Sequence, residues 1–554
     1  MLTSRRSVFT AALLLVGCTG VVQPKNGTQS DTDNVNANES RDAGRDARTR
    51  DASSNHASDE ESDDDESDDD ESGSPDDPSA NAKDANDPAS TATGCTKTQR
   101  LPLAQGLQIR EVALYQTVKI PLLSNGTWVR QRVAPVVQNK KSLVRVFVDP
   151  LTGYRAHTVR AVLTLVNGGT AEDLVDERTI TAASTDAQLG STFSFQVAPG
   201  SISSDTELSV TLAETHCGAA DGDAAAARFP SSGGTQPLEA TQINKLKVVV
   251  VPVNVGGRLP VTTDDEVANM RAALLAYYPV PAVDITVRSP LVWNEAVDPQ
   301  NGNSWSDLLN QIMRERRTDS PASNVYYFGL VQPAATFRAY CQRGCVLGLA
   351  PQTESVQPGA QVGLGASFAD LQTYETMVHE LGHAHGRGHA PCVEGGTIDG
   401  VDSNFPDSTG AIGTWGWDSR TNTLMPPTNK DLMGYCEPNW ISAYNYSGIA
   451  ERSQDVNLKA LRLASGVRWQ NVLLYDDGRA RWGGDLLEDD PAGDYERADV
   501  LDAAGRVIDT VEVVRLGLSH ATSQFLYMPQ PGAQWSALRL ADRVLQLADV
   551  LPPL

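Results

Sequence analysis

Basic residues are scarce in this chain relative to acidic ones. Its 554 residues include 45 Lys and Arg against 70 Asp and Glu, which gives a formal net charge of −25. A protein that binds nucleic acid needs a basic face to replace the counterions of the phosphates, so this balance argues against that class. The same shortage of positive charge argues against electrostatic adhesion to anionic lipid. The length predicts two to four domains.

The apolar run near the N-terminus is short. Residues 8–16 are too few to span a bilayer comfortably, and with Arg5 and Arg6 before them they have the layout of a secretory signal. The run ends in the sequence LVGC, which resembles a bacterial lipobox, in which the cysteine receives a lipid. We therefore expect a signal peptide over residues 1–17, a lipid on Cys18, and a lipoprotein in the outer membrane or at the cell surface. An ordinary signal peptide or anchor that contains a cysteine is the alternative.

Apolar residues are almost missing from the segment that follows. Between Pro24 and Cys95 there are 21 acidic and 6 basic residues. Because like charges repel and little can be buried, residues 18–95 are predicted to form a disordered acidic tether. Contact with a membrane is then expected only through the N-terminal lipid anchor.

Cysteines number only seven. If Cys18 carries a lipid, six remain, and an even number in an exported protein fits three disulfides. No two pairs of cysteines have the spacing of a tetrahedral zinc site. Cys341 and Cys345 are close enough in sequence to form a local pair.

Strand patterns flank a central region in which strands and helices alternate. Short alternating segments with Asn-Gly, Gly-Gly and Pro-Gly turns predict a β-sandwich-like domain, and the central pattern predicts an α/β sheet. In the central region, Thr263 and Ser304 are predicted to cap two helices, and a third helix is expected over residues 367–385. The fold class expected is a multidomain protein, with a central α/β domain between β-sandwich-like domains. The predicted divisions are 96–217 (β-sandwich-like), 218–240 (linker), 241–452 (central α/β domain) and 453–554 (small C-terminal β domain).

Half of the eight histidines lie in the sequence HELGHAHGRGH, which begins at residue 379. His379 and His383 are four residues apart, so on a helix both imidazoles can bind one metal ion. Gly386 allows a sharp turn after the helix, which would bring His389 round as a third ligand. Three imidazoles leave one position of Zn²⁺ open, which is typical of a catalytic zinc site. Glu380 can reach a water molecule at that position.

This pattern resembles the HExxHxxGxxH signature of the metzincin metalloproteases. The resemblance implies a mixed sheet with a zinc-binding helix, one catalytic Zn²⁺, and peptide hydrolysis with Glu380 as the base. The family also carries a methionine turn below the metal, to which Met433 corresponds. Tyr435 follows as in the astacin and serralysin branches, where a tyrosine can donate a hydrogen bond to the transition state. Ala390 matches no branch, so the branch stays open, and the layout is similar to secreted bacterial metzincins that cut glycoproteins such as mucins.

The resemblance also implies a disulfide. The zinc turn and the methionine turn are neighbours in the metzincin fold, which favours a Cys392–Cys436 bridge and leaves Cys95 and Cys217 as the third pair. Three aspartates between the two turns are either turn formers or ligands for Ca²⁺: Asp399, Asp402 and Asp407.

The function expected is that of a zinc-dependent endopeptidase acting on extracellular polypeptides or glycoproteins. The alternatives are a zinc hydrolase of a non-peptide bond and a catalytically inactive surface adhesin, although the intact Glu380 argues against the adhesin. A substrate strand is expected to pair with an exposed sheet edge at residues 345–350 or 361–364. The sequence carries no signal for an oligomeric state.

Overall fold

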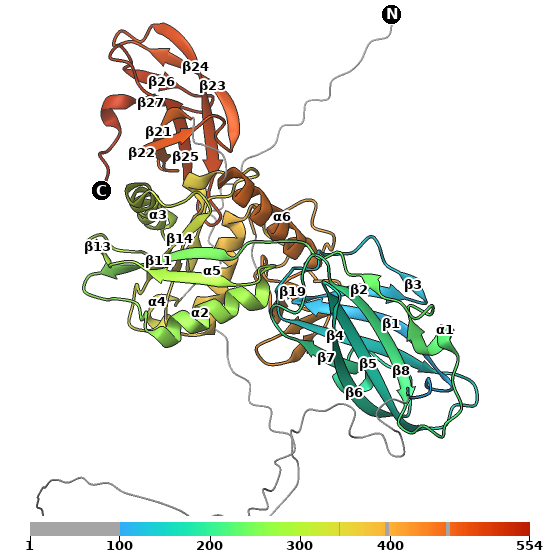
Figure 1. Cartoon of the computed structure of the whole chain (residues 1–554). Coiled ribbons are helices and arrows are strands. Elements are labelled where there is room, and N and C mark those ends of the chain that lie inside the picture. Colours follow the sequence, from blue (N-terminus) through green and yellow to red (C-terminus); the bar gives the residue numbers. More distant parts are fainter. Residues whose placement is uncertain (1–99, 343, 394–397, 461–465) are drawn as a thin grey trace, which may run out of the picture. The chain divides into compact units, whose positions relative to one another are not determined.

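The computed structural model describes residues 100–342, 344–393, 398–460 and 466–554 (Figure 1). The predicted signal peptide, Cys18, the acidic tether and Cys95 lie outside the described residues. Within these ranges, no helix is both long enough and apolar enough to cross a membrane.

Two antiparallel sheets follow Arg100, with strand orders β18-β17-β2-β1-β4-β7 and β10-β8-β5-β6; β3 pairs with β2, and β9 with β8. Along β5, Val159, Ala161 and Leu163 are fully buried, and residues of both sheets belong to one hydrophobic cluster. Period-two burial of this kind is expected where each strand faces a core on one side. The elements of this part are β1 (Leu107–Gln116), β2 (Val118–Ser124), β3 (Thr127–Trp128), β4 (Ser142–Pro150), β5 (His157–Asn167), β6 (Thr170–Ile180), η1 (Leu189–Ser191), β7 (Phe193–Val197), β8 (Glu207–Glu214), α1 (Ala224–Ala227), β9 (Arg228–Phe229) and β10 (Gln236–Pro237).

Two strands of the first sheet come from a distant part of the chain. β17 (Gly416–Asp418) and β18 (Thr423–Met425) lie in sequence between His389 and Met433, and β17 pairs with β2. The sheet therefore joins segments that the sequence patterns assign to different domains, and the predicted domain limits stay a prediction.

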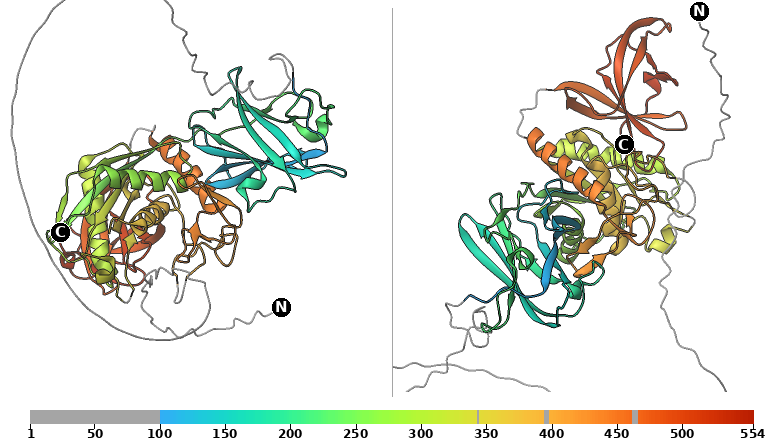
Figure 2. Two further views of the ribbon diagram at one scale, coloured as in Figure 1. Left: turned by 90° about the horizontal axis from the view of Figure 1, so that it is seen from below. Right: turned by 90° about the vertical axis from the view of Figure 1, so that its right-hand side faces the viewer.

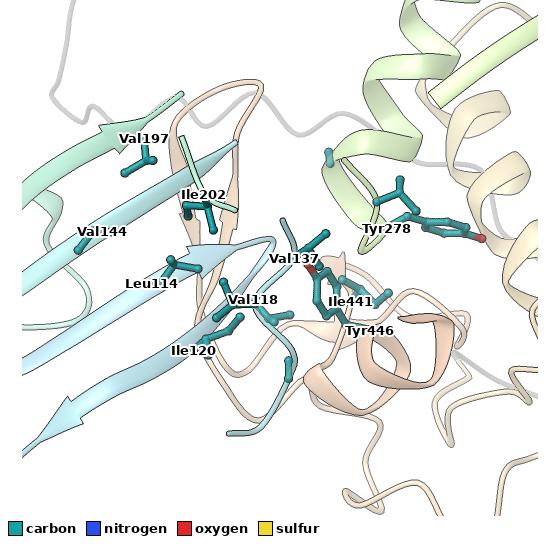
Figure 3. Packing of buried hydrophobic residues seen from close by; sticks show 14 of the residues in the cluster. Leu114, Val118, Ile120, Val137, Val144, Val197, Ile202, Tyr278, Ile441 and Tyr446 are labelled. Carbon is teal, nitrogen blue, oxygen red and sulfur yellow. The ribbon is translucent and has the colours of Figure 1, made fainter. Parts of the chain in front are cut away.

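Hydrophobic packing accompanies this strand pairing. Val118 and Val137, from the first sheet and the loop beside it, belong to the same buried cluster as Ile441 and Tyr446, which come shortly after Met433 (Figure 3). Both Ile441 and Tyr446 are fully buried. The segment that carries Met433 is thus joined to the first sheet by residues both before and after it in the sequence.

The central sheet has the strand order β12-β11-β14-β16-β15, with β13 beside β11. All of its pairs are parallel except β15 with β16. β14 is buried along nearly its whole length, as expected for a strand covered on both faces. The strands are β11 (Leu246–Val255), β12 (Val283–Val287), β13 (Leu291–Trp293), β14 (Val325–Val331), β15 (Gly348–Leu349) and β16 (Val362–Ala366).

Helices cover both faces of this sheet (Figure 2). Thr263 caps α2 as predicted, whereas α3 begins one turn earlier than predicted, because Asn301 rather than Ser304 accepts the capping hydrogen bond. Buried residues of α2, α5 and α6 share one cluster with the sheet, and those of α3 share another. The remaining helices and short elements are α2 (Asp264–Tyr277), α3 (Gly302–Asp319), α4 (Phe337–Tyr340), η2 (Pro358–Ala360), α5 (Leu371–Ala384), β19 (Lys430–Asp431), β20 (Asn439–Trp440) and α6 (Ala443–Ala460).

A further antiparallel sheet lies at the C-terminal end, with the order β22-β21-β25-β24-β23-β26-β27. One face of it packs in the same hydrophobic cluster as α3 and the central sheet. Its β24–β25 connection also forms an antiparallel bridge, Pro351 with Leu518, at the end of β15. The elements are β21 (Val467–Leu474), β22 (Ala480–Glu488), β23 (Asp494–Leu501), β24 (Val507–Gly517), β25 (Gln524–Pro529), β26 (Ala537–Arg539), β27 (Val544–Gln546) and η3 (Leu547–Asp549).

Of the two segments expected to supply a substrate-pairing edge, residues 361–364 do not form one, whereas β15, within residues 345–350, is the edge strand of the central sheet. β16 pairs with β14 on one side and β15 on the other, so it is not an edge. Gly348 and Leu349 of β15 are buried, and the chain just beyond them is bonded to residues 517–519. Sequence patterns at β15 contain no information about this distant partner.

Truncation of a core residue of the C-terminal sheet should test the shared core. Leu516 on β24 is 1% exposed and belongs to the cluster that includes α3, so Leu516→Ala is expected to cost about 2–4 kcal/mol of unfolding free energy. Val507, on the same strand, is 50% exposed, and Val507→Ala should change stability by less than about 0.5 kcal/mol. Thermal unfolding of the two variants measures the difference, and equal midpoints would contradict the shared core.

Candidate metal centre

Helix α5 places the first two histidines of the motif. Asp370 caps it by accepting a hydrogen bond from the Thr373 N–H at 3.0 Å. His379 and His383 then lie one turn apart on the same buried face, with 8% and 0% exposure. The helix predicted over residues 367–385 is therefore confirmed, with Leu371–Ala384 as its limits.

Gly386 ends the helix and turns the chain. Its φ of +80° lies in the left-handed region, which favours glycine. A Cβ at this position would also lie 2.2 Å from Nη2 of Arg452 and 2.8 Å from the carbonyl oxygen of Thr353. Conformation and space both require glycine here, and the turn returns His389 to the face of α5 that carries the other two histidines.

The three histidines point one ring nitrogen each at a common centre. Nε2 of His383 lies 3.0 Å from Nε2 of His379 and 3.1 Å from Nε2 of His389. Each Nδ1 contacts a backbone carbonyl oxygen. The partner of His379 is Leu432, that of His383 is Arg387, and that of His389 is Asp399.

These contacts fix the tautomer of each ring. A carbonyl oxygen accepts only, so each Nδ1 must donate its proton, and each neutral ring then has a bare lone pair on Nε2. Three lone pairs that face one another cannot form hydrogen bonds among themselves and repel unless a cation lies between them. Tetrahedral Zn²⁺ with bonds of about 2.0–2.1 Å would separate the nitrogens by about 3.4 Å, so the donor set fits zinc.

Burial keeps the imidazoles in the form that binds metal. It lowers the pKa of His379 to about 4 and lowers the pKa of His383 and His389 well below the ordinary value. Neighbouring histidines lower the pKa of His383 further, because each would repel a second positive charge. The rings are therefore neutral at physiological pH.

A fourth histidine lies beside the three. His520, in the β24–β25 connection, offers a ring nitrogen within 4.8 Å of the ligand atoms of the other three. Sequence reasoning missed it, because His520 follows His389 by more than a hundred residues and belongs to no spaced motif. The path of β24 and β25 in the C-terminal sheet brings His520 to the centre, and the sequence patterns did not predict that path.

Glu380 and Tyr435 lie next to the histidines, as the resemblance implies. Glu380 is 2% exposed, and its Oε1 lies 3.0 Å from Nε2 of His520. The Tyr435 hydroxyl lies 3.0 Å from Nε2 of His389 and 2.6 Å from Nδ1 of His520. Burial raises the pKa of Tyr435, so its hydroxyl keeps its proton. A Cβ on Gly348 would fall 2.4 Å from Oε1 of Glu380, so β15 closes tightly over the carboxylate.

Met433 packs directly beneath the helix that carries the ligands. It is 1% exposed, and a Cβ on Gly382 would fall 2.5 Å from its sulfur. The Met433 N–H donates to Asp431 at 2.8 Å, and its carbonyl oxygen accepts from the Ala390 N–H at 3.0 Å. The segments that carry His389 and Met433 are thus neighbours, as predicted.

Two of the predicted disulfides are present. Cys392–Cys436 joins the segment after His389 to the segment after Met433, and closing a loop with a sequence separation of 44 stabilises by about 4 kcal/mol in the chain-entropy model. Cys341–Cys345 is the local pair. Cys217 is disulfide-bonded, and Cys95, its predicted partner, lies outside the described residues.

The aspartates between the two turns behave as loop residues, and calcium binding is unsupported. Asp407 accepts from the N–H groups of Thr409 and Ala411, which closes a turn. Asp402 accepts from the hydroxyl of Tyr444 at 2.7 Å, and Asp399 contributes its carbonyl to His389. Among the described residues, none of the three aspartates belongs to a cluster of side chains that could hold a metal ion.

His385 is not part of the centre. It is 1% exposed, stacks on Tyr326 with ring centroids 4.4 Å apart, and contacts the carbonyl of Leu381 through Nδ1. The residue is thus a buried packing residue rather than a solvated one.

Comparison with known families agrees with this geometry. A family model described as Peptidase M66 matches residues 310–442, a span that contains the motif histidines, Glu380 and Met433. No curated protein matches the chain. The family match and the histidine cluster together fit a zinc metallopeptidase.

Replacement of Asp431 should destabilise the segment that carries Met433, which packs against helix α5. The fully buried carboxylate accepts 2.8 Å hydrogen bonds from the N–H groups of Met433 and Ser442 and from the Asn445 side chain. In Asp431→Asn one oxygen becomes an NH₂ group that faces these donors, so we expect a loss of about 2–3 kcal/mol in unfolding free energy. Chemical denaturation measures it, with Asp509→Asn at an exposed position of β24 as the control. Equal stability of the two variants would contradict this role.

Proposed function

We propose that this protein is a metzincin-type zinc endopeptidase that hydrolyses peptide bonds of extracellular proteins or glycoproteins. The observation that carries the proposal is the convergence of three bare Nε2 atoms beside a buried carboxylate. A structural zinc site needs no carboxylate at that position, whereas hydrolysis needs a base there.

The metzincin type rests on further features. The strand order of the central sheet, with β15 as its one antiparallel strand, agrees with the mixed sheet expected from the resemblance. The complete HExxHxxGxxH pattern and the buried Met433 against Gly382 support the same type. The branch within the clan stays open.

The chain's own residues account for the steps of hydrolysis. His379, His383 and His389 would hold Zn²⁺, which supplies a Lewis acid that polarises the scissile carbonyl and lowers the pKa of water. Glu380 takes a proton from the attacking water and delivers it to the leaving nitrogen. The hydroxyl of Tyr435 donates a hydrogen bond to the oxyanion, for which its raised pKa keeps it protonated.

The proposal extends to where the enzyme works. In it the chain is exported, and a lipid on Cys18 with the acidic tether over residues 18–95 holds the catalytic part at the outer membrane or cell surface. The support is the layout of residues 5–18 and the acidic composition of the tether.

Removal of the base should separate metal binding from turnover. Glu380→Ala is expected to lower proteolysis at least about 1,000-fold while one zinc per chain remains bound, because the three ligands are unchanged. The assay is digestion of a panel that includes casein and a mucin by the full chain, with zinc measured by mass spectrometry. Glu451→Ala, at an exposed position of α6, is the matched control.

The controls also distinguish the alternatives. A chelator should abolish cleavage and added Zn²⁺ should restore it. Cleavage that persists in purified Glu380→Ala would contradict the assignment of the base. A zinc-loaded wild type that cuts no protein in the panel would favour a hydrolase of another bond or an adhesin.

A further inference from the structure

The C-terminal sheet enters the catalytic centre through one short connection. Residues 518–523 join β24 to β25. Within it, the Ser519 N–H donates to the carbonyl oxygen of Ala350 at 2.9 Å, and the Ala350 N–H donates to Oγ of Ser519 at 2.9 Å. Leu518 is 7% exposed and packs in the cluster that includes α3. The start of the connection is therefore anchored to the chain just after β15 and to the core that includes α3.

Two consecutive residues of this connection hold the two oxygens of the catalytic carboxylate. Oγ of Ser519 lies 3.1 Å from Oε2 of Glu380, and Nε2 of His520 lies 3.0 Å from Oε1. A carboxylate accepts only, so both Ser519 and His520 are the donors.

The other ring nitrogen of His520 faces Tyr435. Nδ1 lies 2.6 Å from the Tyr435 hydroxyl, within hydrogen-bond distance. The result is one hydrogen-bonded chain that runs from Tyr435 through His520 to Glu380.

We propose that Ser519 and His520 are positioning residues, which fix the Glu380 carboxylate and the Tyr435 hydroxyl relative to each other above the three metal-binding histidines. The inference rests on the proposed function. A glutamate side chain has three rotatable bonds, and displacement of a reacting group by about 1 Å can cost about 100-fold in rate. The C-terminal sheet, on this account, is part of the active site.

Both nitrogens of His520 are already engaged, which argues against its being a fourth metal ligand. Nε2 of His520 lies 3.0 Å from Oε1 of Glu380 and Nδ1 lies 2.6 Å from the Tyr435 hydroxyl. Each of the other three histidines instead uses Nδ1 on a backbone carbonyl and leaves Nε2 for a metal ion. The other interpretation is that His520 acts as a plug, a residue that blocks access of the substrate to the centre. Activity measurements distinguish a plug from a positioning residue.

The test compares three variants of the full chain, with dye-quenched casein and dye-quenched mucin as probes. We expect His520→Ala to lower kcat about 100-fold, with KM changed less than about threefold, one zinc per chain retained and the thermal midpoint nearly unchanged. Ser519→Ala should lower kcat about tenfold. Thr522→Ala is the control, because Thr522 lies in the same connection but bonds to Asp476 instead.

A double variant tests the chain of hydrogen bonds itself. If Tyr435 and His520 act through one chain, His520→Ala combined with Tyr435→Phe should lose less activity than the product of the two single losses. A purely structural role for His520 would not produce this coupling.

Several results would overturn the inference. In His520→Ala these are an unchanged kcat, a rise in activity, which a plug would produce, or a loss of the bound zinc. Failure of the proposed function has a different signature, because the zinc-loaded wild type and Thr522→Ala would then cleave neither probe.

Discussion

Three imidazole lone pairs that converge on one point are the constraint on which the rest of this structure depends. Backbone carbonyls bind the protons of all three Nδ1 atoms, so the Nε2 atoms have no protons to share. Such an arrangement is repulsive on its own and becomes favourable with a divalent cation. Hydrogen bonds and packing within the folded chain also orient the three rings.

Those forces come from four separate parts of the chain. Helix α5 supplies two rings, the turn at Gly386 supplies the third, and the segment that carries Met433 supports them from below. The Cys392–Cys436 bridge and the buried carboxylate of Asp431 fix that segment. The C-terminal sheet then places donors on the opposite side, against Glu380. Pre-organisation of this kind spares the reaction the cost of ordering these groups later.

The predictable part of the site is the part whose spacing is local. A spacing of four positions from His379 to His383 corresponds to about one helical turn, and a glycine at 386 permits the turn that returns His389, so these positions follow from helix geometry. His520 follows from the path of β24 and β25, which no local pattern encodes. The same limit applies to the fold: strand and helix patterns located most elements, whereas the pairing of β17 with β2 joins residues about 300 apart. The start of α3 was misplaced because Asn301 and Ser304 are both good capping residues.

X-ray absorption at the zinc edge of the purified full chain tests the central claim most directly. The account predicts one zinc per chain, bound by three imidazole nitrogens at about 2.0–2.1 Å and one oxygen. Four imidazole nitrogens, or sulfur in the coordination shell, would contradict the assignment of His520 or of the ligand set. A chain that binds no zinc would contradict the account as a whole.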